Sequence, residues 1–125
     1  MIEYIDVHKA FDQPVLAGVS LTVETRETLS IVGPSGTGKS VLLKTTNGLL
    51  VPDRGDVRID GASVYQSERD ALAEIRRKVG YVFQYAALFD SMTVYENVAY
   101  GIQDHEAREL GPKEVLRRVS EALED

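Results

Sequence analysis

One segment constrains this chain more than any other, because it matches the pattern G-x-x-x-x-G-K-[ST]: Gly33-Pro34-Ser35-Gly36-Thr37-Gly38-Lys39-Ser40. Its glycines allow backbone angles that a side chain forbids, so successive N–H groups can point inward at phosphate oxygens. A helical pattern follows, and the free N–H groups and positive dipole at a helix start favour an anion there. The segment therefore predicts a phosphate-binding loop.

Two side chains of this loop carry the chemistry. Lys39 can reach the β- and γ-phosphates of a nucleotide, while the Ser40 hydroxyl can ligate Mg²⁺. Kinases, GTPases, motors and transporters all use such a loop, so the loop alone does not identify the reaction.

Short apolar or alternating runs predict strands at five places, within an α/β chain. They are residues 2–7, 19–24, 29–32, 56–61 and 80–83. A turn at residues 12–14 follows Phe11 and places this ring in a loop.

Helical spacing predicts four helices. The first runs from about Lys39 to Asn47, and its consecutive apolar residues predict burial on more than one side. The second spans about residues 71–79. Thr93 and Glu96 fit a capping box at the start of the third, and Pro112 begins the last.

Composition excludes several classes of function. The net charge of -6 argues against a sequence-independent grip on nucleic acid, since such binders present a basic face. The densest basic run, Arg76-Arg77-Lys78, lies in a helical pattern and is interpreted as a solvated face. The chain has no cysteine, which excludes disulfides and thiolate metal sites. No run approaches the ~18 apolar residues of a membrane span, so membrane association is expected through a partner.

Taken together, the segments make the chain resemble the ATP-binding subunit of ABC transporters, from Ile2 to about Gly101. Beyond the loop, the resemblance rests on residues 16–21, on residues 48–61, and on Val79-Gly80-Tyr81-Val82-Phe83-Gln84, which resembles the family's glutamine loop. The implied fold is the N-terminal part of a P-loop NTPase with a RecA-like core. Residues 1–125 would be a partial ATP-binding domain, with an antiparallel β subdomain and the phosphate-loop core in 1–90. The helical subdomain would start in 91–125.

The resemblance implies roles for two residues outside the loop. Phe11 matches the aromatic position that stacks on adenine, a contact typically worth ~1–3 kcal/mol. Gln84 would touch the Mg²⁺ shell or its water and transmit the nucleotide state to the membrane subunit. Phe11 packed in the core and Gln84 as an exposed polar residue remain alternatives. In the implied site, Lys39 and Gln84 would take part in catalysis, and Ser40 and Gln84 would bind the metal. The residues that would bind the nucleotide are Phe11, Gly33, Pro34, Ser35, Gly36, Thr37, Gly38, Lys39, Ser40 and Gln84.

The resemblance also implies partners and a place in the cell. The ligand would be ATP with Mg²⁺, and the partners an integral membrane permease and a second ATPase subunit in a homodimer, without nucleic acid. The location would be peripheral, at the cytoplasmic face of the inner (cell) membrane. Residues 83–99 and 39–44 resemble more particularly the ATPases of Mce/Mla-type systems, which move phospholipids or related lipids. Four nearby apolar residues would either receive a coupling helix of the permease or fill the helical subdomain's core: Leu88, Phe89, Met92 and Val94.

Some motifs of the family do not occur in these 125 residues. They are the L-S-G-G-Q-like signature, the strand ending in Asp-Glu and the switch histidine. We therefore expect this chain alone not to hydrolyse ATP. Two alternatives to a transporter subunit stay open: a soluble ABC-type ATPase of repair or translation, and a nucleotide-binding module without catalysis.

Overall fold

A computed structural model describes residues 1–66, 69–84, 87–102 and 104–124, without the side chains of 69–70 and 104–109. The chain forms two compact units, Met1–Val82 and Phe83–Asp125. The expected division after residue 90 concerns the family's subdomains and stays a prediction.

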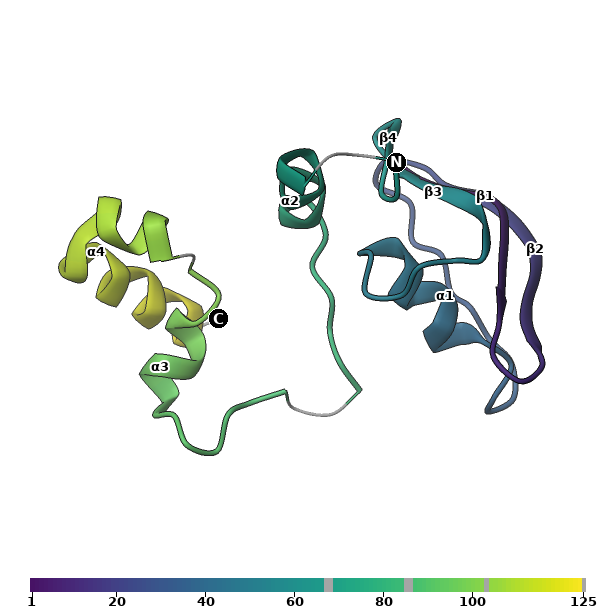
Figure 1. The fold of residues 1–125 in the computed structure, drawn as a ribbon. Coiled ribbons are helices and arrows are strands. Elements are labelled where there is room, and N and C mark those ends of the chain that lie inside the picture. Colours follow the sequence, from purple (N-terminus) through teal and green to yellow (C-terminus); the bar gives the residue numbers. More distant parts are fainter. Residues whose placement is uncertain (67–68, 85–86, 103, 125) are drawn as a thin grey trace. The chain divides into compact units, whose positions relative to one another are not determined.

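The first unit is built on a four-stranded antiparallel sheet, in the order β2-β1-β3-β4 (Figure 1). The strands are β1 (Ile2–Ala10), β2 (Pro14–Val23), β3 (Arg54–Ile59) and β4 (Ala62–Ser63). Tyr4 of the central β1 pairs with Leu21 on one side and Val57 on the other. The predicted strands at 2–7, 19–24 and 56–61 are therefore confirmed, and Phe11 lies in the turn between β1 and β2.

Two helices belong to the same unit. Helix α1 (Lys39–Thr46) buries Leu42 and α2 (Arg69–Arg77) buries Ile75, in a core shared with Val7 and Val57 of the sheet. Helix α1 ends at Asn47, and Gly48 follows with φ 69°, as the sequence predicts. Leu43, the neighbour of Leu42, is exposed, so the expectation that α1 is buried on more than one side is wrong for the described residues.

Two predicted strands are absent. Residues 29–32 and 80–83 have no strand structure, and the side chains of Val32 and Val82 are 89% and 94% exposed. A strand is defined by its ladder of hydrogen bonds, and among the described residues neither segment has a neighbouring strand. The apolar composition of the two segments is typical of strands, but composition does not specify a strand for them to pair with.

The second unit contains α3 (Val94–Ala99) and α4 (Asp104–Glu124), which pack on each other. The predicted capping box is confirmed: Thr93 Oγ1 accepts from the Glu96 N–H at 3.2 Å, and the Glu96 carboxylate accepts from the Thr93 N–H at 2.7 Å. Helix α4 is interrupted at Gly111, with φ 72° and ψ 163°, and a second helical run starts at Pro112 as predicted.

Within the ranges that the structure describes, no helix combines the length and apolar character needed to cross a bilayer.

Candidate functional site

The predicted phosphate loop lies between residues 29–32 and the start of α1, against β2. Gly36 and Gly38 have φ of 82° and 91°, in the left-handed region that favours glycine. A Cβ on Gly38 would lie 2.9 Å from Val15 Cγ1 and 3.0 Å from the Val15 carbonyl oxygen. Gly38 is therefore needed twice, for its backbone angle and for the close approach of the loop to β2.

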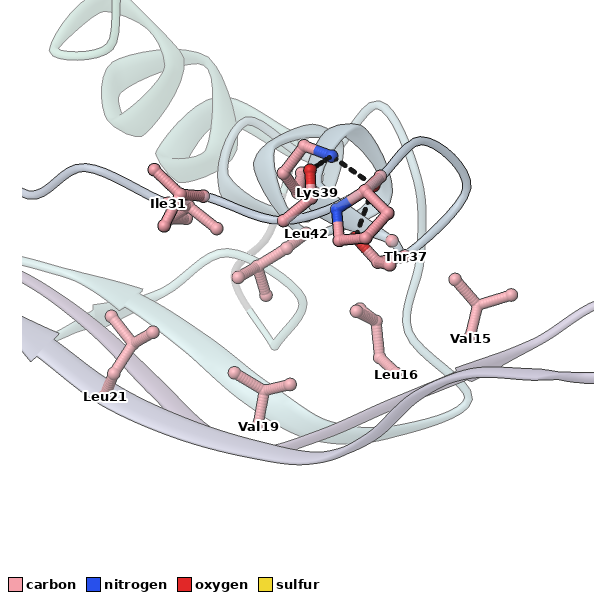
Figure 2. A pocket seen from close by; sticks show the side chains of 12 residues that line it. Val15, Leu16, Val19, Leu21, Ile31, Thr37, Lys39 and Leu42 are labelled. Atoms are coloured by element: carbon pink, nitrogen blue, oxygen red, sulfur yellow. Dashed lines mark hydrogen bonds between the residues drawn. The ribbon is translucent and has the colours of Figure 1, made fainter.

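Lys39 is bonded to its own loop. Its ammonium donates to the carbonyl oxygens of Gly33 at 2.7 Å and Pro34 at 2.6 Å, and Thr37 Oγ1 also donates to Pro34 at 2.9 Å (Figure 2). A lysine ammonium has three N–H donors, so these two bonds leave one for a phosphate oxygen. The cation is thereby held beside the loop backbone, where the negative charge of a phosphate would be most strongly attracted.

The start of α1 adds to this attraction. Gly38 is the N-cap residue and offers no side-chain cap, and the first turn has no acidic residue. The first N–H groups of a helix have no partner within it, and they carry the positive end of the helix dipole. Nothing in the first turn of α1 neutralises that end, so loop, ammonium and helix start act on an anion in the same direction.

A cavity of about 300 Å³ opens in front of the loop. Its lining joins the hairpin turn to the loop and α1: Phe11, Val15, Gly36, Gly38, Lys39, Ser40 and Val41. Phe11 is 61% exposed, so it does not pack in the core. The structure thus places the aromatic ring, the lysine and the serine around one space, although residues 11 and 39 are far apart in sequence.

A second cavity, of about 450 Å³, lies between β2 and the loop. Figure 2 shows Leu16, Val19 and Leu21 on β2 on the side that faces Ile31 and Leu42, while Val15 lies beneath the loop. Gly33, Pro34, Thr37 and Lys39 complete one side. Although this cavity is larger, its mostly apolar lining suits a triphosphate poorly, since an unpaired charge is costly among apolar groups. Sequence reasoning did not identify it, because the alternation in β2 predicts a half-buried face and not what lies above it.

The residues present fit a nucleotide with Mg²⁺. Ser40 lines the cavity in front of the loop and is exposed there. No group of three or more His, Cys, Asp or Glu side chains that could hold a metal ion occurs in the described residues. Mg²⁺ is commonly held by one or two protein oxygens together with substrate phosphates and water. Ser40 would be one such ligand. Ser35 is an exposed loop residue that lines neither cavity.

Gln84 lies in the second unit and is exposed. Its predicted role at the metal stays a prediction.

Leu88 and Val94, in the same unit, are exposed as well, each by 66%. The Phe89 ring contacts the Tyr100 ring at a centroid distance of 4.8 Å, and the Phe89 N–H donates to Asn97 Oδ1 at 2.8 Å. Within this unit α3 thus holds residue 89, while Leu88 and Val94 remain exposed and Met92 is half-buried.

The carboxyl end of α1 is held by side chains that sequence reasoning missed. Arg76 of α2 donates from Nε to the Asn47 carbonyl at 3.0 Å and from its guanidinium to the Gly48 carbonyl at 3.2 Å. The Tyr65 hydroxyl lies within hydrogen-bond distance of two carbonyl oxygens and donates to them: that of Thr45 and that of Leu50, the second at 2.8 Å. Burial raises the pKa of Tyr65 above its usual value, so the hydroxyl keeps this proton. Arg76 is exposed, as a solvated face implies, and its bonds to the Asn47 and Gly48 carbonyls give it a structural role that the sequence did not indicate.

A family model described as ABC transporter matches residues 16–125. The methionine import ATP-binding protein MetN of Brucella abortus is 37% identical over 99% of this chain, which covers 33% of that protein. The phosphate import ATP-binding protein PstB of Pyrococcus furiosus is 41% identical over 98% of this chain, which covers 50% of that protein. The chain thus spans a third to a half of the length of these relatives.

A solved structure is similar over nearly the whole chain. It is the dimeric post-hydrolysis state of the ATP-binding cassette MJ0796 bound to ADP and Pi, with a TM-score of 0.84 and 33% identity. The match covers 99% of this chain and 56% of that one. It confirms the predicted fold class, an α/β chain forming the N-terminal part of a P-loop ATPase domain with an antiparallel β subdomain.

Proposed function

The chain belongs to the ABC transporter family of ATP-binding domains, and from this premise we propose that it binds Mg-ATP in the cavity before Gly33–Ser40, within an ATP-driven transporter. The observation that carries the proposal is the shared lining of that cavity. Phe11, Lys39 and Ser40 surround it, and these are a stacking ring, a cation and a hydroxyl. Each matches a different part of Mg-ATP: the base, the phosphates and the metal.

The phosphates would lie on the loop. N–H groups of the loop and of the start of α1 would donate hydrogen bonds to the phosphate oxygens, and Lys39 would donate to the β- and γ-phosphates. Mg²⁺ bound to Ser40 and to the phosphates would neutralise charge there. Adenine would stack on Phe11, which is exposed at the other side of the same cavity.

Gln84 would link the nucleotide to the transporter. We propose that its amide contacts the Mg²⁺ shell or its water, and that it reports the nucleotide state to a permease. The exposed apolar residues Leu88, Phe89 and Val94 would receive a helix of that permease. Exposed apolar side chains clustered near a polar functional residue are typical of a protein contact.

Hydrolysis needs groups beyond this cavity. In-line attack on the γ-phosphate requires a group that positions the water, in addition to charge stabilisation. Among the described residues, no carboxylate lines the cavity before the loop. We propose that the ATPase reaction takes place when two ATPase subunits pair, and the similar cassette structure bound to ADP and Pi is itself dimeric. The subunit would sit peripherally at the cytoplasmic face of the cell membrane.

The transported substrate is proposed from residues 83–99 and 39–44, whose resemblance to Mce/Mla-type ATPases favours a phospholipid or related lipid. The two relatives named above are called methionine and phosphate import proteins. Transport assays with lipid, methionine and phosphate, carried out with the same transporter, would decide among the three.

Two measurements test the proposed function. The affinity for Mg-ATP is expected to exceed that for AMP by at least about tenfold, since AMP lacks the two phosphates that Lys39 reaches. Equal affinities would contradict a triphosphate site.

A pull-down is expected to recover an integral membrane protein. Recovery of ribosomes or DNA in its place would favour a soluble ABC-type ATPase of translation or repair.

A further inference from the structure

Lys9 lies beside the Phe11 ring and has no role in the ATP site proposed above. It lies on β1, two positions before Phe11, and its Nζ is over the Phe11 ring at 5.7 Å from the centroid. A cation within about 6 Å of a ring centroid is attracted by the negative face of the ring. The Lys9 side chain is only 15% exposed, whereas the ring itself is 61% exposed. The less exposed Lys9 side chain can therefore orient the more exposed ring.

Asp53 holds Lys9 in this place. Its Oδ1 accepts from Lys9 Nζ at 2.7 Å, and its Oδ2 accepts from the Ala10 N–H at 2.7 Å. The Asp53 N–H donates to the His8 carbonyl at 2.8 Å. Asp53 is thus bonded to three consecutive residues of β1, and this fixes the position of its carboxylate.

The charge of the pair is secured by the same contacts. The hydrogen bonds from Lys9 and from the Ala10 N–H hold the pKa of Asp53 below its usual range. The Asp53 carboxylate is therefore charged at neutral pH and pairs with the Lys9 ammonium.

We propose that Lys9, held by Asp53, is a positioning residue for the adenine site and acts through the Phe11 ring. The inference rests on the proposed function, because it requires a base stacked on Phe11. The cation on one face orients the ring before the nucleotide arrives, so less side-chain freedom is lost on binding. It also draws π-electron density towards itself, which weakens the repulsion between the opposite face and the π-electrons of the base.

Lys9 does not line the cavity before the loop, although Phe11 does. The cation thus lies over the Phe11 ring without lining the space proposed for the nucleotide. This arrangement separates a role through Phe11 from direct attraction between Lys9 and the phosphates, because direct attraction would not depend on the ring or on the base.

The test compares a ligand that has a base with one that has none. Lys9→Met keeps an unbranched side chain and removes the charge. Titration calorimetry on the ATP-binding subunit would measure the affinity for Mg-ATP and for magnesium tripolyphosphate. We expect Lys9→Met to weaken Mg-ATP binding about two- to fivefold, the range of an exposed cation–π contact, and to leave tripolyphosphate binding unchanged. In a Phe11→Ala background, Lys9→Met should have no further effect on Mg-ATP.

Three further variants complete the design. Lys78→Met removes another lysine that pairs with an aspartate, Asp60 at 3.4 Å, and is expected to leave both affinities unchanged. Lys9→Arg keeps a cation and should retain most of the affinity for Mg-ATP. If Lys9→Met does not fold, Asp53→Asn, which releases Lys9 without removing it, should weaken Mg-ATP and spare tripolyphosphate.

Three results would overturn the inference. Equal weakening of both ligands by Lys9→Met would show direct attraction or a general structural role. If Lys9→Met leaves the Mg-ATP affinity unchanged while Phe11→Ala lowers it, the base stacks on Phe11 but Lys9 has no role in that stacking. Unchanged affinity in Phe11→Ala would refute base stacking itself, while tripolyphosphate binding would still report on the phosphate loop.

Discussion

Arg76 donates from Nε to the carbonyl oxygen of Asn47 at 3.0 Å, and so ties α2 to the carboxyl end of the helix that begins at Lys39. The last carbonyls of a helix lack partners within it and carry its negative dipole end, so a guanidinium there is favourable in two ways. The helix at the proposed phosphate site is thus stabilised from its far end.

Arg76→Met is therefore expected to lower the free energy of unfolding by about 1 kcal/mol, the size of a typical hydrogen bond to a helix end. Urea denaturation would measure it. Arg77→Met is the matched control, because Arg77 pairs with Glu74 on the surface of the same helix, and exposed pairs contribute little. Equal destabilisation by both variants would contradict a specific role for Arg76.

Lys39→Ala is expected to weaken Mg-ATP binding by about 10- to 100-fold, the loss of a charge-assisted hydrogen bond. Titration calorimetry on the ATP-binding subunit would measure it. Lys44→Ala removes a lysine from the last turn of the same helix and should have little effect. If Lys39→Ala leaves the affinity unchanged, the assignment of the phosphate loop is wrong.

Gln84→Ala is expected to impair transport-linked ATPase activity more than it weakens ATP binding, because the proposed role of Gln84 is to report the nucleotide state. The comparison needs both measurements on the same reconstituted transporter. Loss of both to the same degree, or of neither, would count against coupling through Gln84.

A polypeptide of residues 1–125 is expected not to release phosphate from ATP, since no carboxylate lines the proposed site within the described residues. A phosphate-release assay on monodisperse protein would test this expectation. Magnesium-dependent release that Lys39→Ala abolishes would refute it.

Alkali is expected to destabilise the first unit through Tyr65. Burial raises the pKa of Tyr65 above its unfolded value of about 10, so the folded state keeps a proton that the unfolded state releases. Stability from this group is complete below pH 10 and is lost as the pH rises further. Urea denaturation at neutral pH and above pH 10 should show a smaller loss for Tyr65→Phe than for the unaltered chain.

Features determined over a few neighbouring residues could be predicted from the sequence. The glycines, lysine and serine of the loop act over eight consecutive positions, and Thr93 caps a helix through Glu96, three residues later. Strand alternation in β1, β2 and β3 also needs only one face of a sheet to be buried. Each of these signals lies within a few residues, because the hydrogen bonds or the periodicity behind it link near neighbours in the chain. The structure confirms the helix after the loop, the capping box and the three strands.

Only the tertiary structure decided which distant residues meet. Residues 29–32 have the composition of a strand, yet a strand requires a partner that composition does not specify. Asp53 lies 44 positions from Lys9, and Arg76 lies 29 from Asn47, so neither contact has a signal in the neighbouring sequence. Each depends on how the sheet brings β1 beside the turn before β3, or α2 beside the end of α1. The sequence by itself determined the glycine-rich loop of residues 33–40 and the helix that follows it. Packing decided what surrounds the loop, because side chains far apart in the chain become neighbours only when the sheet and helices bury their apolar faces together.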